Sequence, residues 1–253
     1  MSNTPLVSII TPCYNAALFI ERTIESVLAQ SYTNWEMIIV DDASTDLSQE
    51  IITKYISKNK QIKLLVNKKN MGTAESRNVA IREAAGEYIA FLDNDDIWLP
   101  QKLSKQVLLM QEEDIFLSYS SYDTIDKSGQ PIGHFPVQEK VCYSDMLKTS
   151  IIGTLTMIYN AKKLGKFYFH GVGHEDYVMK LEILKKTKFA KGINETLAKY
   201  RILNDSLSRN KIRAAKWQWH IYRDIEKLPL LKSIYYFMHY TYRGLTKYKK
   251  YRY

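Results

Sequence analysis

Short apolar runs alternate with amphipathic stretches through the first hundred residues, and this alternation restricts the possible folds more than any other feature. The runs are β-branched and apolar, which is typical of buried strands. Strands are predicted at residues 6–11, 36–42, 62–67 and 88–93. Helical spacing of apolar residues predicts helices at residues 19–28, 47–56 and 73–85. Such alternation predicts an α/β fold of the Rossmann-like type, a mostly parallel sheet with helices on both faces.

Beyond Glu112 the pattern is less regular. We expect a strand within 154–160, a helix that opens at the acids of "HEDY", and one or two strands within 190–202. From about Ile212 onward, aromatic and aliphatic residues alternate with lysine and arginine at helical spacing. The chain therefore divides into a body, residues 1–210, and a basic, aromatic helical tail, residues 211–253.

Polar residues follow each of the four predicted strands. They are residues 12–15, 41–42, 67–70 and 93–96. In an open α/β sheet the ligand binds beyond the carboxyl ends of the strands, so these residues are expected to share one site. No GxGxxG or GxxxxGK[ST] motif is present, which argues against a nucleotide held by a glycine-rich loop.

Two groups of acids stand out at the strand ends. Asp93, Asp95 and Asp96 lie within four positions, and clustered carboxylates suit the hard cations Mg²⁺ or Mn²⁺. The alternative is a solvated turn whose acids cap the next helix. In the pair Asp41–Asp42, one acid is enough to cap the helix expected to begin near Ser44, which leaves the other for a base or sugar hydroxyl.

Net charge and cysteine content restrict the function and the cellular location of the protein further. The chain has a net charge of +9, and residues 211–253 carry all of it, with eleven lysines and arginines against two acids. A neutral body argues against nucleic-acid binding. Cys13 and Cys142 form no CxxC motif, so we expect reduced thiols and a cytosolic location. No signal peptide and no membrane-spanning stretch is expected.

Three segments together resemble the family 2 glycosyltransferases of the GT-A fold. They read "VSIITPCYNAALFIERTIESVLAQSYTNWEMIIVDDASTD", "NMGTAESRNVAIREAAGEYIAFLDNDDIWLP" and "HEDY". The similarity is dense over residues 6–100 and becomes weaker toward residue 210. The similarity is specific, because these three segments together contain four motifs in the family's order and spacing. Enzymes of cell-envelope polysaccharide synthesis, such as teichuronic acid or capsule, share these motifs.

The resemblance implies a nucleotide-sugar donor, most simply a UDP-sugar, and a divalent metal, Mn²⁺ or Mg²⁺. Asp41 matches the acid that binds uracil, and Asp42 its neighbour near the ribose. Asp93 and Asp95 match the DxD motif, with Asp95 as direct metal ligand. The implied donor-binding residues are Pro12, Tyr14, Asn15, Asp41, Asp42, Arg77, Asp93 and Asn94.

The resemblance also implies an inverting reaction with Asp176 as general base, and Glu175 is the competing candidate. Residues expected on the acceptor side are Trp98, His174, Glu175 and Arg201. For Trp98 a place in the core is the alternative, and for His174 it is a cap of the helix. The chain departs from the family at Leu203, where many relatives have a histidine. This departure puts one metal or diphosphate contact in doubt, unless Arg201, Asn204, Ser206 or Ser208 replaces it.

These expectations describe a metal-dependent glycosyltransferase that extends a cell-envelope polysaccharide or a lipid-linked saccharide. The basic tail would hold it peripherally on the anionic inner face of the cell membrane. Two alternatives remain open: a nucleotidyltransferase, for which a glycine-rich basic loop is missing, and a non-catalytic membrane-binding module.

Overall fold

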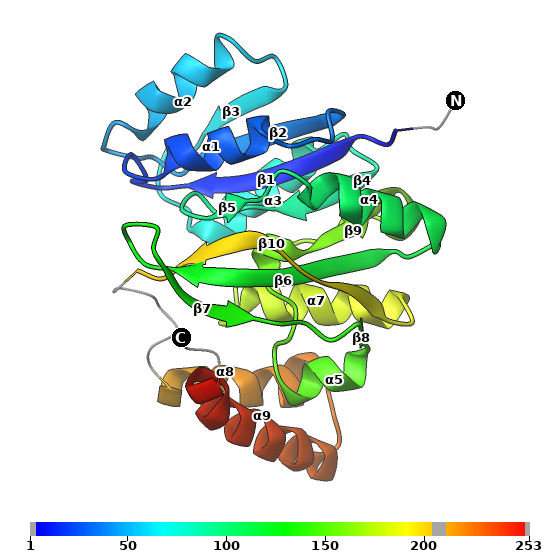
Figure 1. Cartoon of the computed structure of the whole chain (residues 1–253). Coiled ribbons are helices and arrows are strands. Elements are labelled where there is room, and N and C mark those ends of the chain that lie inside the picture. Colours follow the sequence, from blue (N-terminus) through cyan, green and yellow to red (C-terminus); the bar gives the residue numbers. More distant parts are fainter. Residues whose placement is uncertain (1–3, 204–210, 251–253) are drawn as a thin grey trace.

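The computed structural model of the chain describes residues 4–203 and 211–250 (Figure 1). Its strands are β1 (Val7–Cys13), β2 (Trp35–Asp41), β3 (Ile62–Val66), β4 (Tyr88–Phe91), β5 (Ile97–Trp98), β6 (Leu117–Ile125), β7 (Pro131–Phe135), β8 (Lys140–Val141), β9 (Ile158–Asn160) and β10 (Ala190–Arg201). Its helices are α1 (Ile20–Leu28), α2 (Ser48–Ile56), α3 (Thr73–Glu83), α4 (Lys102–Glu112), α5 (Tyr143–Lys148), α6 (Ala161–Leu164), α7 (Glu175–Lys186), α8 (Lys211–His220) and α9 (Leu230–Lys250). A 3₁₀ turn, η1 (Thr154–Thr156), and a π-helical turn, η3 (Ile221–Ile225), complete the described elements.

One mixed sheet organises the described part of the chain, in the order β3-β2-β1-β4-β9-β6-β10-β5. The predicted strands in the first hundred residues are confirmed as β1 to β4, all parallel. Every residue of β1, β2 and β4 is buried, as expected for strands covered on both faces. One core cluster packs α1, α2 and α4 on one face, and the second packs α3, α5 and α7 on the other.

The second half of the sheet preserves the direction of the first. Strand β9 is antiparallel to both β4 and β6, and β10 is parallel to β6. Strands β1, β2, β4, β6 and β10 therefore all end at the same edge of the sheet. The expected strand within 154–160 is only partly correct, because η1 occupies its first half. The segment 190–202 forms one strand, β10, with irregular register against β6.

The C-terminal helices pack beneath α5 and α7 (Figure 1). Ile221 and Tyr222 are fully buried in a core cluster, and the Tyr222 hydroxyl donates to the carbonyl of Leu147. A side chain at Gly173 would overlap the Trp217 ring of α8, with a Cβ only 1.9 Å from its Cδ2, so this close approach requires glycine. The expected boundary at residue 210 falls in the stretch 204–210, outside the described residues. Within the described ranges, no helix combines the length and apolar character that crossing a bilayer requires.

Candidate active site

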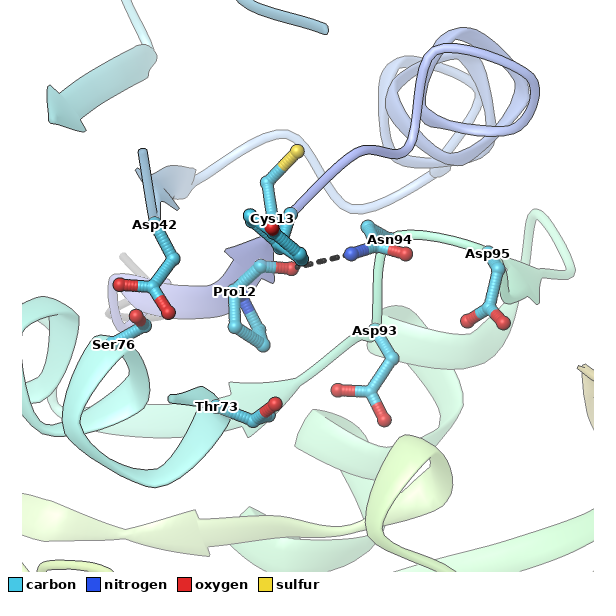
Figure 2. A pocket seen from close by; sticks show the side chains of 9 residues that line it. Pro12, Cys13, Asp42, Thr73, Ser76, Asp93, Asn94 and Asp95 are labelled. Atoms are coloured by element: carbon cyan, nitrogen blue, oxygen red, sulfur yellow. Dashed lines mark hydrogen bonds between the residues drawn. The ribbon is translucent and has the colours of Figure 1, made fainter. Parts of the chain in front are cut away.

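A pocket of about 200 Å³ opens at the carboxyl edge of the sheet (Figure 2). Its walls come from the ends of β1 and β2, the first turn of α3 and the loop after β4. The lining residues are Pro12, Cys13, Tyr14, Asp42, Thr73, Ser76, Asp93, Asn94 and Asp95. The Asn94 side-chain amide donates to the Pro12 carbonyl at 3.1 Å, which ties the acidic loop to β1. The strand-end rule thus predicted the position of the pocket.

The two acids after β2 have different roles from those expected. Asp41 is fully buried and does not line the pocket; one of its oxygens accepts from the Ser44 backbone N–H at 3.0 Å and from the Gln49 amide at 2.7 Å. Asp41 is therefore not placed for the expected contact with a base. It caps no helix either, because α2 begins at Ser48 with Leu47 as its N-cap residue and has no side-chain cap. Asp42 lines the pocket instead.

Asp42 also organises the loop that leads into α3. Its carboxylate accepts from the Asn67 amide and from the backbone N–H groups of Met71 and Gly72, each at 2.8 Å. Burial alone would raise the pKa of Asp42, but these hydrogen bonds outweigh burial and lower it. The carboxylate is therefore held ionised at the pocket wall.

The acids after β4 point in different directions. Asp93 and Asp95 line the pocket, as Figure 2 shows. Burial and the neighbouring Asp93 raise the pKa of Asp95 to about 6, because both disfavour its ionised form. Among the described residues no three His, Cys, Asp or Glu side chains converge. The donor set fits Mg²⁺ or Mn²⁺ held by one or two carboxylates together with substrate phosphates.

Asp96 is buried away from the pocket and is linked to Arg201. Burial, followed by the charges of Asp95 and Asp93, raises its pKa well above the usual value, and its Oδ1 accepts from the Arg201 backbone N–H at 2.9 Å. The Arg201 guanidinium donates to the carbonyls of Asp95 and Asp126, both at 2.9 Å, and is only 2% exposed. Arg201 therefore supports the acidic loop, and the expected acceptor contact is contradicted.

Arg77 is a buried bridge between two parts of the site. Its Nη2 donates to Asp93 at 2.5 Å, its Nη1 lies 3.8 Å from Glu175, and its guanidinium covers the Phe169 ring. The side chain is only 8% exposed and is absent from the pocket lining. Instead of touching a nucleotide as expected, it joins the acidic loop to the start of α7.

Asp176 lies on the first turn of α7, next to Glu175. Its Oδ2 accepts from the Thr154 hydroxyl at 2.9 Å and from the Lys180 ammonium at 2.7 Å. Burial raises the pKa of Asp176, but Lys180, Thr154 and Arg77 together lower it far below the usual range. Burial raises the pKa of Glu175, and the Arg77 charge opposes this effect. The two candidate bases thus differ in their partners: Glu175 faces Arg77, and Asp176 is held by Lys180.

Two residues expected on the acceptor side, Trp98 and His174, have different surroundings. Trp98 is 1% exposed; its indole N–H donates to the Leu155 carbonyl at 2.8 Å and Lys102 covers its ring, so the core alternative is correct. His174 adopts a left-handed backbone conformation (φ 60°) and packs edge-on against Trp217. Burial lowers the pKa of His174.

The remaining predicted residues lie around the pocket mouth. Tyr14 lines it and is 48% exposed, whereas Asn15 braces the neighbouring loop by accepting from the Thr45 N–H at 2.9 Å. Thr73 and Ser76 were missed, and Cys13 was expected only as part of the segment 12–15. A signal for Thr73 and Ser76 was present, because hydroxyls on a helix that follows a strand end lie at the ligand edge. Asn204, Ser206 and Ser208 are outside the described residues.

The geometry can be compared with known proteins. The model of the family "Glycosyl transferase family 2" matches residues 8–169, more than half of the chain. The chain is a family 2 glycosyltransferase. A Bacillus subtilis protein named for teichuronic acid biosynthesis, TuaG, is 41% identical over 96% of this chain and 97% of its own length. The Escherichia coli glucosyltransferase WfgD is 38% identical over 96% of this chain and 94% of its own.

Solved structures support the GT-A fold of this glycosyltransferase. The Staphylococcus aureus TarS fragment 1–349, in complex with UDP-GlcNAc, superposes with a TM-score of 0.71 at 21% identity. The match covers 86% of this chain and 64% of that fragment. The mannosyltransferase PcManGT of Pyrobaculum calidifontis, in complex with GDP-Man and Mn²⁺, gives a TM-score of 0.69 at 21% identity, covering 93% and 70% of the two chains.

Proposed function

We propose that this glycosyltransferase is metal-dependent and inverting, and that it moves a sugar from a UDP-sugar to a hydroxyl of a lipid-linked saccharide of the cell envelope. One observation carries the proposal. Arg77 links Asp93 of the pocket to Glu175, which is adjacent to Asp176, and so brings together acids some 80 residues apart in sequence. A donor in the pocket would then have a carboxylate base within reach of its sugar.

The pocket would hold the donor by its nucleoside diphosphate. Asp42 lies on one side of the pocket, and Asp93 and Asp95 lie on the other (Figure 2). Tyr14 also lines it. The first turn of α3 offers the Thr73 and Ser76 hydroxyls and a positive helix end to the phosphates. UDP is favoured because TarS was solved with UDP-GlcNAc and with UDP, and WfgD is named for UDP-Glc.

Asp95, with Asp93 beside it, would hold Mn²⁺ or Mg²⁺. The bound cation would neutralise the negative charge that develops on the departing diphosphate. Asp93 keeps one oxygen on Arg77, so Asp95 is the carboxylate with more freedom to bind a cation. The raised pKa of Asp95 fits this role, because burial beside Asp93 destabilises its ionised form until a cation arrives.

The transfer would proceed as one displacement. The acceptor hydroxyl oxygen bonds to C1 of the donor sugar as the bond from C1 to the diphosphate oxygen breaks. The hydroxyl proton passes to Asp176, and the electron pair leaves on the nucleoside diphosphate. A single displacement inverts the anomeric centre, and it requires one general base and no covalent intermediate.

The acceptor class follows from the relatives. The WfgD name specifies α-D-GlcNAc-diphosphoundecaprenol as acceptor, and the TuaG name specifies teichuronic acid biosynthesis. We therefore propose a saccharide on a polyprenyl diphosphate, which resides at a membrane surface.

The C-terminal helix α9 would bring the enzyme to that surface. Leu231, Met238 and Tyr242 are 81%, 60% and 69% exposed and recur at helical spacing on one face with Ile234 and Tyr235. The same segment contains Lys232 and Arg243, which suit anionic headgroups. We propose that this exposed α9 face rests on the anionic inner surface of the cell membrane.

Transfer is tested by incubating the protein with UDP-glucose and a synthetic GlcNAc-diphosphoryl lipid in Mn²⁺, and by measuring UDP release and product configuration. Asp176→Asn should lower the rate at least 100-fold with UDP binding intact, and Asp95→Ala should abolish Mn²⁺-dependent UDP binding by calorimetry. Glu83→Gln, an exposed acid at the end of α3, is the control. A wild-type rate of transfer in Asp176→Asn would refute the role of Asp176 as general base. Release of pyrophosphate from UTP would favour the nucleotidyltransferase alternative.

Membrane docking is tested by sedimentation with phosphatidylglycerol and phosphatidylcholine vesicles. Leu231→Glu/Met238→Glu should lose binding to the anionic vesicles and keep transfer to a short-chain, soluble acceptor. Leu108→Glu, on the exposed side of α4, should bind as the wild type does. Equal binding of all three proteins would refute a docking role for α9.

A further inference from the structure

Helix α7 contains a buried cation that the reaction described above does not use. Lys180 is 1% exposed, and it lies one helical turn after Asp176. Its ammonium donates to Asp176 Oδ2 at 2.7 Å. A buried ammonium is costly unless it is paired, so this lysine is fixed in place by the carboxylate that it contacts.

The hydrogen bonds on Asp176 are unevenly distributed between its two oxygens. Oδ2 accepts from both Lys180 and Thr154, the latter at 2.9 Å. Oδ1 accepts from no residue that the structure describes, and it is not among the fully buried oxygens without a partner. The Asp176 side chain is 36% exposed. Oδ2 is thus clamped from two elements, η1 and α7, while Oδ1 has no hydrogen-bond donor among the described residues.

The charges around Asp176 are mixed. Lys180 and Arg77 favour the ionised form of Asp176. The adjacent Glu175 is also acidic, and the Asp176 charge raises its pKa after burial has done so. The neighbouring His174 ring has a lowered pKa, mainly because of burial. Lys180 is the largest of the influences that oppose burial at Asp176.

We propose that Lys180, together with Thr154, is the positioning residue that holds Asp176 by Oδ2 and presents Oδ1 to the acceptor hydroxyl. This inference rests on the proposed function, because it gives a role to the surroundings of the proposed base. Lys180 is not among the residues that line the donor pocket, and its ammonium donates to Asp176, so it acts through Asp176.

Clamping has a chemical consequence as well as a geometric one. A carboxylate stabilised by an ammonium is a weak base, yet it remains ionised throughout the physiological pH range. A weak base suffices here, because the acceptor hydroxyl becomes acidic as its oxygen bonds to a cation-like sugar carbon. The clamp therefore secures ionisation and orientation, which a displacement needs at the moment of attack.

The test compares Lys180→Met with the wild type in UDP release from UDP-glucose onto the GlcNAc-diphosphoryl lipid, at saturating Mn²⁺ from pH 5 to pH 8. The kcat of the variant should fall roughly 10- to 100-fold at pH 7, with the KM for UDP-glucose within about twofold. The deficit should grow as the pH falls, because Asp176 without Lys180 protonates at higher pH. Lys180→Arg should recover part of the rate, and Lys186→Met, an exposed lysine of the same helix, is the matched control.

A second measurement needs no substrate. Carboxyl ¹³C NMR, with Asp176→Asn used to assign the resonance, should show an Asp176 signal that is constant between pH 4 and pH 7 in the wild type and titrates in Lys180→Met. Should Lys180→Met fail to fold, Thr154→Val gives the same readouts with a smaller effect. A wild-type kcat, or a deficit that is constant with pH and an unmoved Asp176 resonance, overturns the inference. Undiminished transfer in Asp176→Asn overturns the proposed function itself, so the two failures are distinct.

Discussion

Replacement of Arg77 by methionine tests whether this residue is a structural bridge or a nucleotide contact. The variant keeps the aliphatic part of the side chain, but it removes the guanidinium that covers Phe169, pairs with Asp93 and lies near Glu175. Loss of one partner from a fully buried ion pair costs about 3–5 kcal/mol. Asp93 and Glu175 keep 32% and 29% of their side chains exposed, so water can partly solvate the stranded acids. We therefore expect a loss of about 2–3 kcal/mol in the free energy of unfolding.

The assay is urea unfolding at pH 7 without ligand, followed by circular dichroism and by a thermal scan. A loss of that size should lower the Tm by roughly 5–10 °C for a chain of this length. Arg82→Met is the matched control, because Arg82 lies on the same helix and pairs with Glu75 at an exposed site. It should change stability by less than about 1 kcal/mol. An unchanged unfolding free energy in Arg77→Met, together with a loss confined to UDP binding, would refute the bridge and restore the nucleotide contact.

Two further predictions concern Asp42 and Trp98. Because the folded-state pKa of Asp42 is lowered, its contribution to stability is complete above its unfolded pKa of about 3.9 and is lost as the pH falls through the folded value. Asp42→Asn should therefore lower the free energy of unfolding at pH 7 by about 1–3 kcal/mol. Urea titrations should show that the difference in stability between the variant and the wild type narrows below pH 4. A difference that is independent of pH would contradict the role of the ionised carboxylate. Trp98→Phe removes the hydrogen bond to Leu155 and leaves a cavity, so it should lower the free energy of unfolding by about 2–3 kcal/mol. The KM for the acceptor should stay within about twofold of the wild type. A rise in that KM without a loss of stability would show that Trp98 contacts the acceptor.

Several parts of the fold could be predicted because they depend on local pattern. The apolar runs that became β1 to β4 are recognisable from composition alone, and parallel strands with intervening helices leave few topologies. The acids after β2 and β4 lie at the carboxyl edge of the sheet because parallel strands end at the same edge. The secondary structure was harder to predict after Glu112. The segment 154–160 divides between η1 and β9, and a short turn and a short strand have similar composition.

The sequence by itself determined which chemical groups are gathered at the carboxyl edge of the sheet, since strand periodicity and chain direction follow from local residue types. Only the tertiary structure decided which way each group points. Asp42 rather than Asp41 faces the pocket, Arg77 and Arg201 support the acidic loop from behind, and Lys180 clamps Asp176. The physical reason is that the orientation of a side chain depends on hydrogen-bond partners and packing that include distant segments, as Thr154 shows for Asp176, 22 positions away. For Arg77 and Asp93 the partner is 16 positions away, and for Arg201 and Asp95 it is 106 positions away, distances over which local pattern carries no information.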